Sequence, residues 1–164
     1  MNPFKVYGKF NLIKLLVSVA IPEGVGILSR VLTSNQMEVY KKLEQPPFAP
    51  PSWVFGVVWP ILYLLMGLAA YRIWMHKSQG VDTKDALFYY YAQLVFNFIW
   101  SILFFRLGLR GLALVDLIIL LIFVIITTVK FYRVDKLSGW LMIPYIIWLI
   151  YATFLNLAVW LLNR

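Results

Sequence analysis

Five long apolar runs divide this chain, and they constrain its fold more than any other feature of the sequence. Each run has about twenty residues, the length of helix that crosses the roughly 30 Å hydrocarbon layer of a bilayer. Strands of a membrane barrel are about half as long and alternate in polarity, unlike these runs. The pattern predicts an all-α integral membrane bundle of five transmembrane helices, forming a single domain over residues 1–164. The expected helices cover residues 11–31, 53–74, 86–107, 111–130 and 139–162.

The composition excludes several other classes of protein. Of the 164 residues, 62% are hydrophobic and only 13% are charged, and the mean hydropathy is +0.80, so little polar surface is available to cover a soluble core. There is no cysteine and one histidine, His76, so neither thiolate ligands nor a histidine metal cluster can form. We therefore expect no metal and no covalent cofactor. The net charge of +8 is scattered between the apolar runs, as in membrane flanks, so no nucleic-acid partner is expected.

The distribution of positive charge predicts an orientation, because cytoplasmic flanks of membrane helices carry an excess of Lys and Arg. The N-terminus and the second and fourth connections hold nine basic residues, which are Lys5, Lys9, Lys14, Arg72, Lys77, Lys84, Lys130, Arg133 and Lys136. The opposite side holds six, which are Arg30, Lys41, Lys42, Arg106, Arg110 and Arg164. We therefore expect a cytoplasmic N-terminus and an external C-terminus.

The first connection, residues 33–52, is the only long one in the predicted bundle. Its first half has the apolar spacing of a short helix. Its second half is rich in proline, which stiffens the chain in an extended form, and contains Pro46, Pro47, Phe48, Pro50 and Pro51. Two interpretations stay open, a linker clamped on the mouth of the bundle and a lid over a cavity.

Four polar side chains are expected within the membrane, where a charged group costs about 2.5–3.5 kcal/mol unless it faces protein or water. They are Glu23, Asn97, Asp116 and Asn156. Their expected depths agree with one polar-lined cavity that opens beneath residues 33–52. The alternatives are that the asparagines bond across helices, that Asp116 pairs with Arg110 or stays protonated, and that Glu23 serves a helix break. A proton pathway is a weaker interpretation, because the acids have no Lys or His partner within the helices.

Four of the seven tryptophans differ from the usual interfacial tryptophans at helix ends. Trp53 begins the second predicted helix and lies directly beneath the first connection. Trp59, Trp100 and Trp148 lie deeper in the membrane than the helix ends. Ala152 follows Trp148 by one helical turn, so both project toward the same face. An aromatic wall with amides and small residues suits a flat apolar ligand that carries one or two polar groups.

The same residues carry a family resemblance. Residues 46–59 read PPFAPPSWVFGVVW, and residues 93–97 read QLVFN with Trp100 one turn later. Residues 113–116 read ALVD, and residues 144–156 read PYIIWLIYATFLN. In this order the motifs resemble the tryptophan-rich sensory protein family, which includes the mitochondrial translocator protein, also called the peripheral benzodiazepine receptor.

The resemblance implies a bundle of five helices, usually a homodimer in the bilayer, that binds porphyrins such as protoporphyrin IX and benzodiazepine-type ligands. It places the protein in a bacterial cell membrane and implies a ligand cavity closed by the first loop. The residues expected to line or support the cavity are Trp53, Asn97, Trp100, Trp148, Ala152 and Asn156. Some family members bind cholesterol, but their sterol-associated pattern follows the fifth helix, where this chain has no tyrosine.

Three functional hypotheses follow. The first is a membrane receptor or sensor that binds a tetrapyrrole. The second is a light-dependent enzyme that degrades porphyrin with Trp53 and Trp148, although no conventional catalytic constellation is present. The third is a transporter of porphyrin or sterol, which the absence of two similar halves disfavours. Bleaching of the bound pigment in light would separate an enzyme from a receptor, and vesicle uptake would identify a transporter.

Overall fold

The structure, a computed structural model, describes residues 2–164, and it confirms an all-α fold with five helices long and apolar enough to cross a membrane. These are α1 (Leu12–Leu32), α3 (Trp53–Lys77), α4 (Lys84–Ser101) with its π-helical continuation η1 (Ile102–Arg106), α5 (Arg110–Val134) and α6 (Lys136–Leu162). A short helix, α2 (Gln36–Lys42), lies in the long first connection. The spans lie where the apolar runs predict them, with several ends extended by up to four residues.

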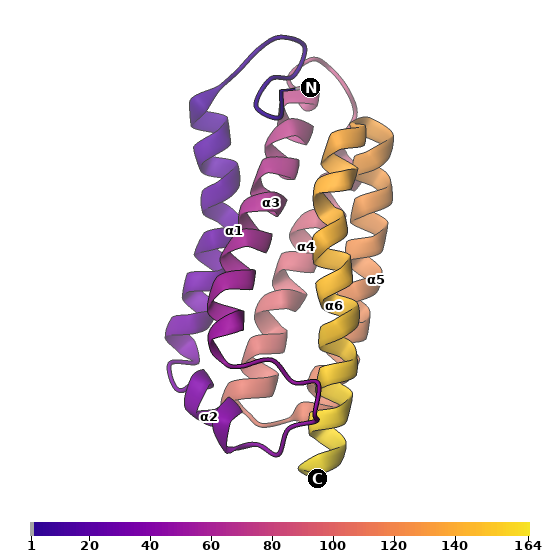
Figure 1. Ribbon diagram of the computed structural model, residues 1–164. Coiled ribbons are helices and arrows are strands. Elements are labelled where there is room, and N and C mark those ends of the chain that lie inside the picture. The colour runs from indigo at the N-terminus through magenta and orange to yellow at the C-terminus, as the bar shows by residue number, and fades with distance from the viewer. Residues whose placement is uncertain (1) are drawn as a thin grey trace.

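The long helices pack in a ring with one loose side. Helix α1 packs along α3, α3 along α6, α6 along α5, and α5 along α4. Only a few residues of α1 contact α4 and η1, so the ring closes weakly on that side. The two termini lie at opposite ends of the bundle, as an odd number of crossings requires (Figure 1).

Gly67 allows a close contact between α1 and α3. A Cβ atom added at Gly67 of α3 would lie 2.6 Å from Cα of Val19 on α1, so the missing side chain lets two backbones approach. Large apolar side chains such as Ile13, Ile147 and Phe154 point outward from the bundle. Helices that are apolar all round belong in lipid, so these side chains are the lipid-facing surface.

A buried ion pair fastens the end of the bundle that carries the N-terminus. Arg72 on α3 is only 4% exposed, and its Nε donates to Oδ2 of Asp135 over 2.7 Å. Its Nη1 donates to the backbone oxygens of Pro3 and Lys5. Asp135 separates α5 from α6 and caps α6 by accepting from the backbone N–H of Ser138. Burial alone would raise the pKa of the Asp135 carboxyl, but the bonds from Arg72 and Ser138 and the Arg72 charge hold that pKa well below its usual range.

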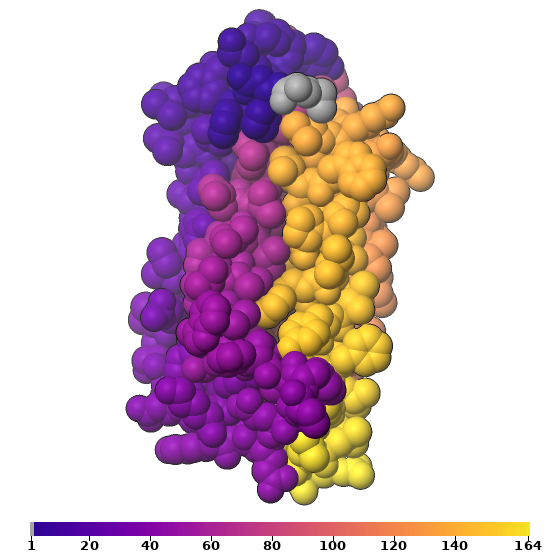
Figure 2. Space-filling view, viewed as in Figure 1, coloured from indigo at the N-terminus to yellow at the C-terminus, as the bar shows by residue number. Residues whose placement is uncertain are grey.

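At the other end, residues 33–52 cross the mouth of the bundle and lie against α6 (Figures 1 and 2). The backbone N–H of Glu44 donates to Oδ1 of Asn163, and Nδ2 of Asn163 donates back to the Glu44 carbonyl. The Tyr151 hydroxyl on α6 donates to the Phe48 carbonyl over 2.8 Å. This segment is therefore attached to the bundle through its backbone, independently of which side chains it presents.

Candidate ligand-binding site

A cavity opens where α1 and α4 pack loosely, beneath the segment that carries α2. It encloses about 860 Å³ of space, part of which is open to the surroundings. Its walls come from α1, α2, α3, α4 and η1. We call this space the α1 cavity.

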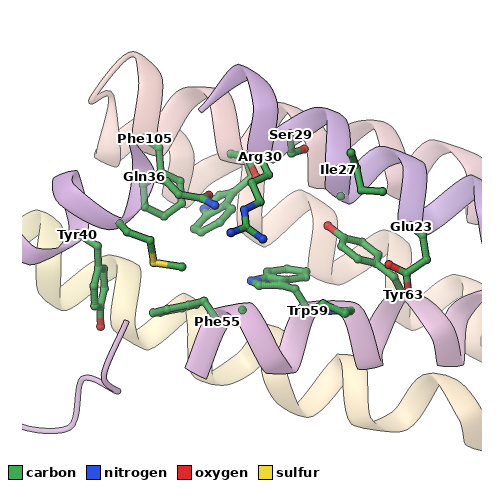
Figure 3. A pocket seen from close by; sticks show the side chains of 16 residues that line it. Glu23, Ile27, Ser29, Arg30, Gln36, Tyr40, Phe55, Trp59, Tyr63 and Phe105 are labelled. Carbon is green, nitrogen blue, oxygen red and sulfur yellow. The ribbon is translucent and has the colours of Figure 1, made fainter. Parts of the chain in front are cut away.

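One wall of the α1 cavity is aromatic. The Trp59 ring stacks on Tyr63 at 5.5 Å between centroids and lies 6.4 Å from the Trp100 ring. Phe55 and Phe105 extend this wall toward the mouth (Figure 3). Such rings offer flat apolar surface at fixed angles, which suits a planar ligand.

The facing wall comes mainly from α1 and carries the charged side chains of the cavity. Glu23, Gly26, Ile27 and Arg30 follow the spacing of one helix face, and all four line the cavity. The Arg30 side chain reaches into the space between α1 and α3 (Figure 3). No carboxylate of residues 2–164 forms an ion pair with it. The hydroxyl of Ser29, a residue that is 6% exposed, also lines the cavity without a hydrogen-bond partner among these residues.

Two local backbone features shape this space. Gly26 has no side chain, and a Cβ there would meet the Tyr63 ring at 2.4 Å, so the glycine lets that ring approach α1 closely. The π-helical turn η1 is wider than an α-turn, as the bond from Leu107 N–H to the Ile102 carbonyl shows. Such insertions often occur at functional sites, and this one carries Phe105 into the cavity wall.

A second, smaller space of about 350 Å³ lies on the other side of the aromatic wall, against α6. It shares Tyr40, Phe55, Trp59, Trp100 and Phe105 with the α1 cavity and is otherwise lined by Phe104, Trp148, Ala152, Leu155 and Asn156. We call it the α6 pocket. Its Trp148 Nε1 is buried without a hydrogen-bond partner among residues 2–164, which leaves a donor available to a ligand.

Tyr40 connects the two spaces with the loop above them. Its ring lines both, and its hydroxyl donates to the Pro50 carbonyl over 2.9 Å. Burial, with a smaller effect of nearby Tyr151, raises the pKa of Tyr40 to about 12, so this hydroxyl keeps its proton at physiological pH. The loop is therefore attached to the cavity through a residue of the cavity wall.

The structure brings four of the predicted site residues together around the α6 pocket: Trp100, Trp148, Ala152 and Asn156. Two of their polar groups are already paired, because Nε1 of Trp100 donates to Oδ1 of Asn156 over 3.0 Å. Trp148 is thus the member of this group whose polar atom is available.

Asn97 lies beside the site rather than in its lining. Its Oδ1 accepts from the Tyr63 hydroxyl and its Nδ2 donates to the Tyr145 hydroxyl, both over 2.7 Å. The Tyr145 hydroxyl donates in turn to Oε1 of Gln93. Of the two roles expected for Asn97, lining or supporting the cavity, its position corresponds to the second: its amide joins three helices and contacts Tyr63 of the cavity wall.

The expectation that Trp53 lines the cavity also differs from the structure. Trp53 is 66% exposed and belongs to the lining of neither space. Trp59 lies six residues later on the same helix, which rotates its direction by about 240°. The two indoles cannot face one cavity, and the packing of α3 turns Trp59 inward.

The remaining expectations concern the loop and the acids. Neither space is lined by Pro46, Pro47, Phe48, Pro50 or Pro51, so these residues cross the mouth without reaching into it. Asp116 is 7% exposed and lines neither space, and its Oδ2 has no hydrogen-bond partner among residues 2–164. Glu23 does reach the α1 cavity, as expected of a membrane-buried acid.

Several lining residues were missed from the sequence, namely Arg30, Phe55, Tyr63 and Phe105. In the sequence, Arg30 has the position of a charge that flanks a membrane helix. Its spacing of seven from Glu23 is the signal that would have found it, since residues two turns apart share a helix face. Phe105 reaches the cavity wall because it lies in the π-helical turn, and no pattern in the sequence predicts that turn.

Comparisons with known proteins agree with this architecture. The TspO/MBR family matches residues 18–161. The tryptophan-rich protein TspO of Archaeoglobus fulgidus is 38% identical over 154 residues, covering 93% of this chain and 99% of that protein. The human translocator protein is 38% identical over 140 residues, covering 84% and 82%. The tryptophan-rich sensory protein of Cereibacter sphaeroides is 39% identical over 126 residues, covering 77% of each chain. This chain is an integral membrane protein of the TspO/MBR family.

Proposed function

We propose that this protein is a membrane receptor or sensor that binds tetrapyrroles such as protoporphyrin IX in the α1 cavity. The observation that carries the proposal is an aromatic wall, with Trp59 and Trp100, facing a cationic side chain, Arg30, that has no ion pair within residues 2–164. Protoporphyrin IX is a flat apolar ring whose propionates share one edge. The wall matches the ring, and Arg30 matches the acidic edge.

The α6 pocket extends this site. The two spaces share five lining residues, among them Phe55 and Trp59. In our proposal, rotation of one shared ring lets a large ligand in the α1 cavity reach Trp148 and Ala152. The unpaired Nε1 of Trp148 then donates to a polar group of the ligand.

The test is a titration of the purified protein in detergent with protoporphyrin IX, followed by tryptophan fluorescence and the porphyrin absorption band. Arg30→Gln should weaken binding about 10- to 150-fold, because a hydrogen bond to a charged group contributes about 1.5–3 kcal/mol. The same substitution should change the affinity for the dimethyl ester of protoporphyrin very little, because the ester lacks the carboxylates that Arg30 would bind. Arg106→Gln is the matched control, since Arg106 is exposed like Arg30 but lines neither space. Equal effects on acid and ester would remove Arg30 from the site, and no binding of either would refute the proposal.

The same titration in light and in darkness distinguishes a receptor from a porphyrin-degrading enzyme. A receptor leaves the absorption band of the bound pigment intact in light, whereas an enzyme destroys it at a rate proportional to the protein present. The degradation hypothesis assigns roles to Trp53 and Trp148, and of these two only Trp148 lines one of the two spaces.

A further inference from the structure

The α1 cavity carries opposite charges at its two ends. Arg30 lies near the end of α1, next to the loop, and Glu23 lies two turns earlier on the same face, about 10 Å away along the axis. Gly26 and Ile27 fill the interval, so no other polar side chain of α1 separates the charges on this face. Figure 3 shows Glu23 beside Tyr63 at one end of the cavity, and Arg30 nearer Gln36.

Neither charge is satisfied by the protein itself. Among residues 2–164, the ion pairs join Arg72, His76 and Lys130 to other acids, and none involves Glu23 or Arg30. Glu23 is half-buried inside a membrane-spanning helix, where the surroundings other than the cavity are protein and lipid. A charge in such a place acts strongly on a ligand, because the low local dielectric weakens its screening.

We propose that Glu23 is a specificity-determining residue that restricts the cavity to tetrapyrroles with carboxylates on one edge only. This inference rests on the proposed function. The acidic edge of such a ligand meets Arg30, and its apolar edge lies toward Glu23 and Tyr63. A porphyrin with carboxylates distributed around the ring places one of them against Glu23, whichever way it enters, and like charges at close range disfavour that complex. Glu23 thereby selects the ligand and fixes the direction in which it enters.

The experiment compares the affinities of protoporphyrin IX, whose propionates share one edge, and coproporphyrin III, whose propionates are distributed around the ring. The wild-type protein should prefer protoporphyrin IX. Glu23→Gln should strengthen coproporphyrin III binding by about tenfold or more, equivalent to about 1.4 kcal/mol, and change protoporphyrin IX binding by less than about threefold. Glu23→Leu, which removes the polar group altogether, should shift the ratio in the same direction.

Glu38→Gln is the matched control, because it removes the same charge from an exposed position on α2 that lines neither space. It should leave the ratio of the two affinities unchanged. Melting of each variant without ligand verifies folding. A wild-type protein without preference, or an unchanged ratio in both Glu23 variants, overturns the inference while the proposed function stands. A wild-type protein that binds neither porphyrin overturns the proposed function and the inference together.

Discussion

Nε1 of Trp100 on α4 donates a hydrogen bond to Oδ1 of Asn156 on α6 over 3.0 Å. Nδ2 of the same asparagine donates to the backbone carbonyl of Arg110, the first residue of α5, over 2.9 Å. One buried amide therefore connects three helices beside the α6 pocket. Because Trp100 also lines the α1 cavity, this amide fixes the orientation of the indole that both spaces share.

Asn156→Leu should lower the free energy of unfolding by about 1–3 kcal/mol, since it leaves the buried Trp100 N–H without an acceptor. Unfolding by heat or by denaturing detergent, monitored by circular dichroism, measures this change. Trp100→Phe and the double variant complete a cycle, and the coupling energy should be about 0.6–1.7 kcal/mol, as for hydrogen bonds between membrane helices. A coupling energy of zero would show that the bond contributes nothing to stability.

Ala152→Leu should weaken protoporphyrin IX binding by roughly 5- to 150-fold. Ala152 is 7% exposed and lines the α6 pocket with Trp148, so a larger side chain fills space that the proposed ligand reaches. Overpacking typically costs about 1–3 kcal/mol, and each 1.4 kcal/mol is about tenfold in affinity. Ala158→Leu, on the same helix and outside the pocket lining, is the control. Unchanged affinity in a folded Ala152→Leu protein would confine the ligand to the α1 cavity.

Acid should destabilise the bundle through Asp135. Its pKa in the folded protein lies below the value of about 3.9 for a free aspartate, so its contribution to stability is present above that value and is lost as the pH falls through the folded-state pKa. Melting temperatures measured from pH 7 to pH 3 should therefore begin to fall at the acid end of this range. Asp135→Asn should show a flatter acid limb and should lose about 3–5 kcal/mol at neutral pH, because Arg72 is left buried without its partner. An acid limb as steep as in the wild-type protein would assign the effect to other groups.

Gly67→Ala should separate α1 from α3. The added Cβ would meet backbone atoms of Val19 and Ser18 at 2.6 and 2.9 Å, and backbone cannot move aside as a flexible side chain can. We expect a loss of about 1–3 kcal/mol in the free energy of unfolding, measured by thermal melting. Gly56→Ala, on the same helix with no atom within 4 Å of its added Cβ, should be neutral or stabilising. Equal losses for the two variants would contradict the close approach at Gly67.

Asn163→Ala should release the loop from the end of α6. Two hydrogen bonds join Asn163 to the Glu44 backbone. Without them, the free energy needed to release the loop should fall by about 1–2 kcal/mol, which should speed trypsin cleavage after exposed Lys41 and Lys42 about 5- to 30-fold. Asn35→Ala is the control, because the Asn35 side chain makes no capping hydrogen bond to α2. The cleavage rate is followed by gel electrophoresis with and without protoporphyrin IX. Slower cleavage with porphyrin is expected of a lid, and equal rates would favour the linker.

The amino-acid sequence by itself determined the class of the molecule and the positions of its five membrane-spanning helices. Runs of about twenty apolar residues can satisfy their backbone groups in lipid only as helices, so hydropathy and length were sufficient. The position of Glu23 at the α1 cavity follows from its place in an apolar run, because an acid there must face protein or a cavity. The motif that includes Trp148, Ala152 and Asn156 occupies one helix face, so a spacing of four predicts that these residues lie together.

Only the tertiary structure decided which polar groups remain available. The rotation of α3 places Gly67 against α1, turns Trp59 inward and leaves Trp53 exposed. The amide of Asn97 is used by Tyr63 and Tyr145, two partners from other helices that no local pattern predicts. Helical spacing fixes the relative direction of side chains within one helix, but the rotation of each helix and its hydrogen bonds to neighbours depend on contacts between residues far apart in the chain.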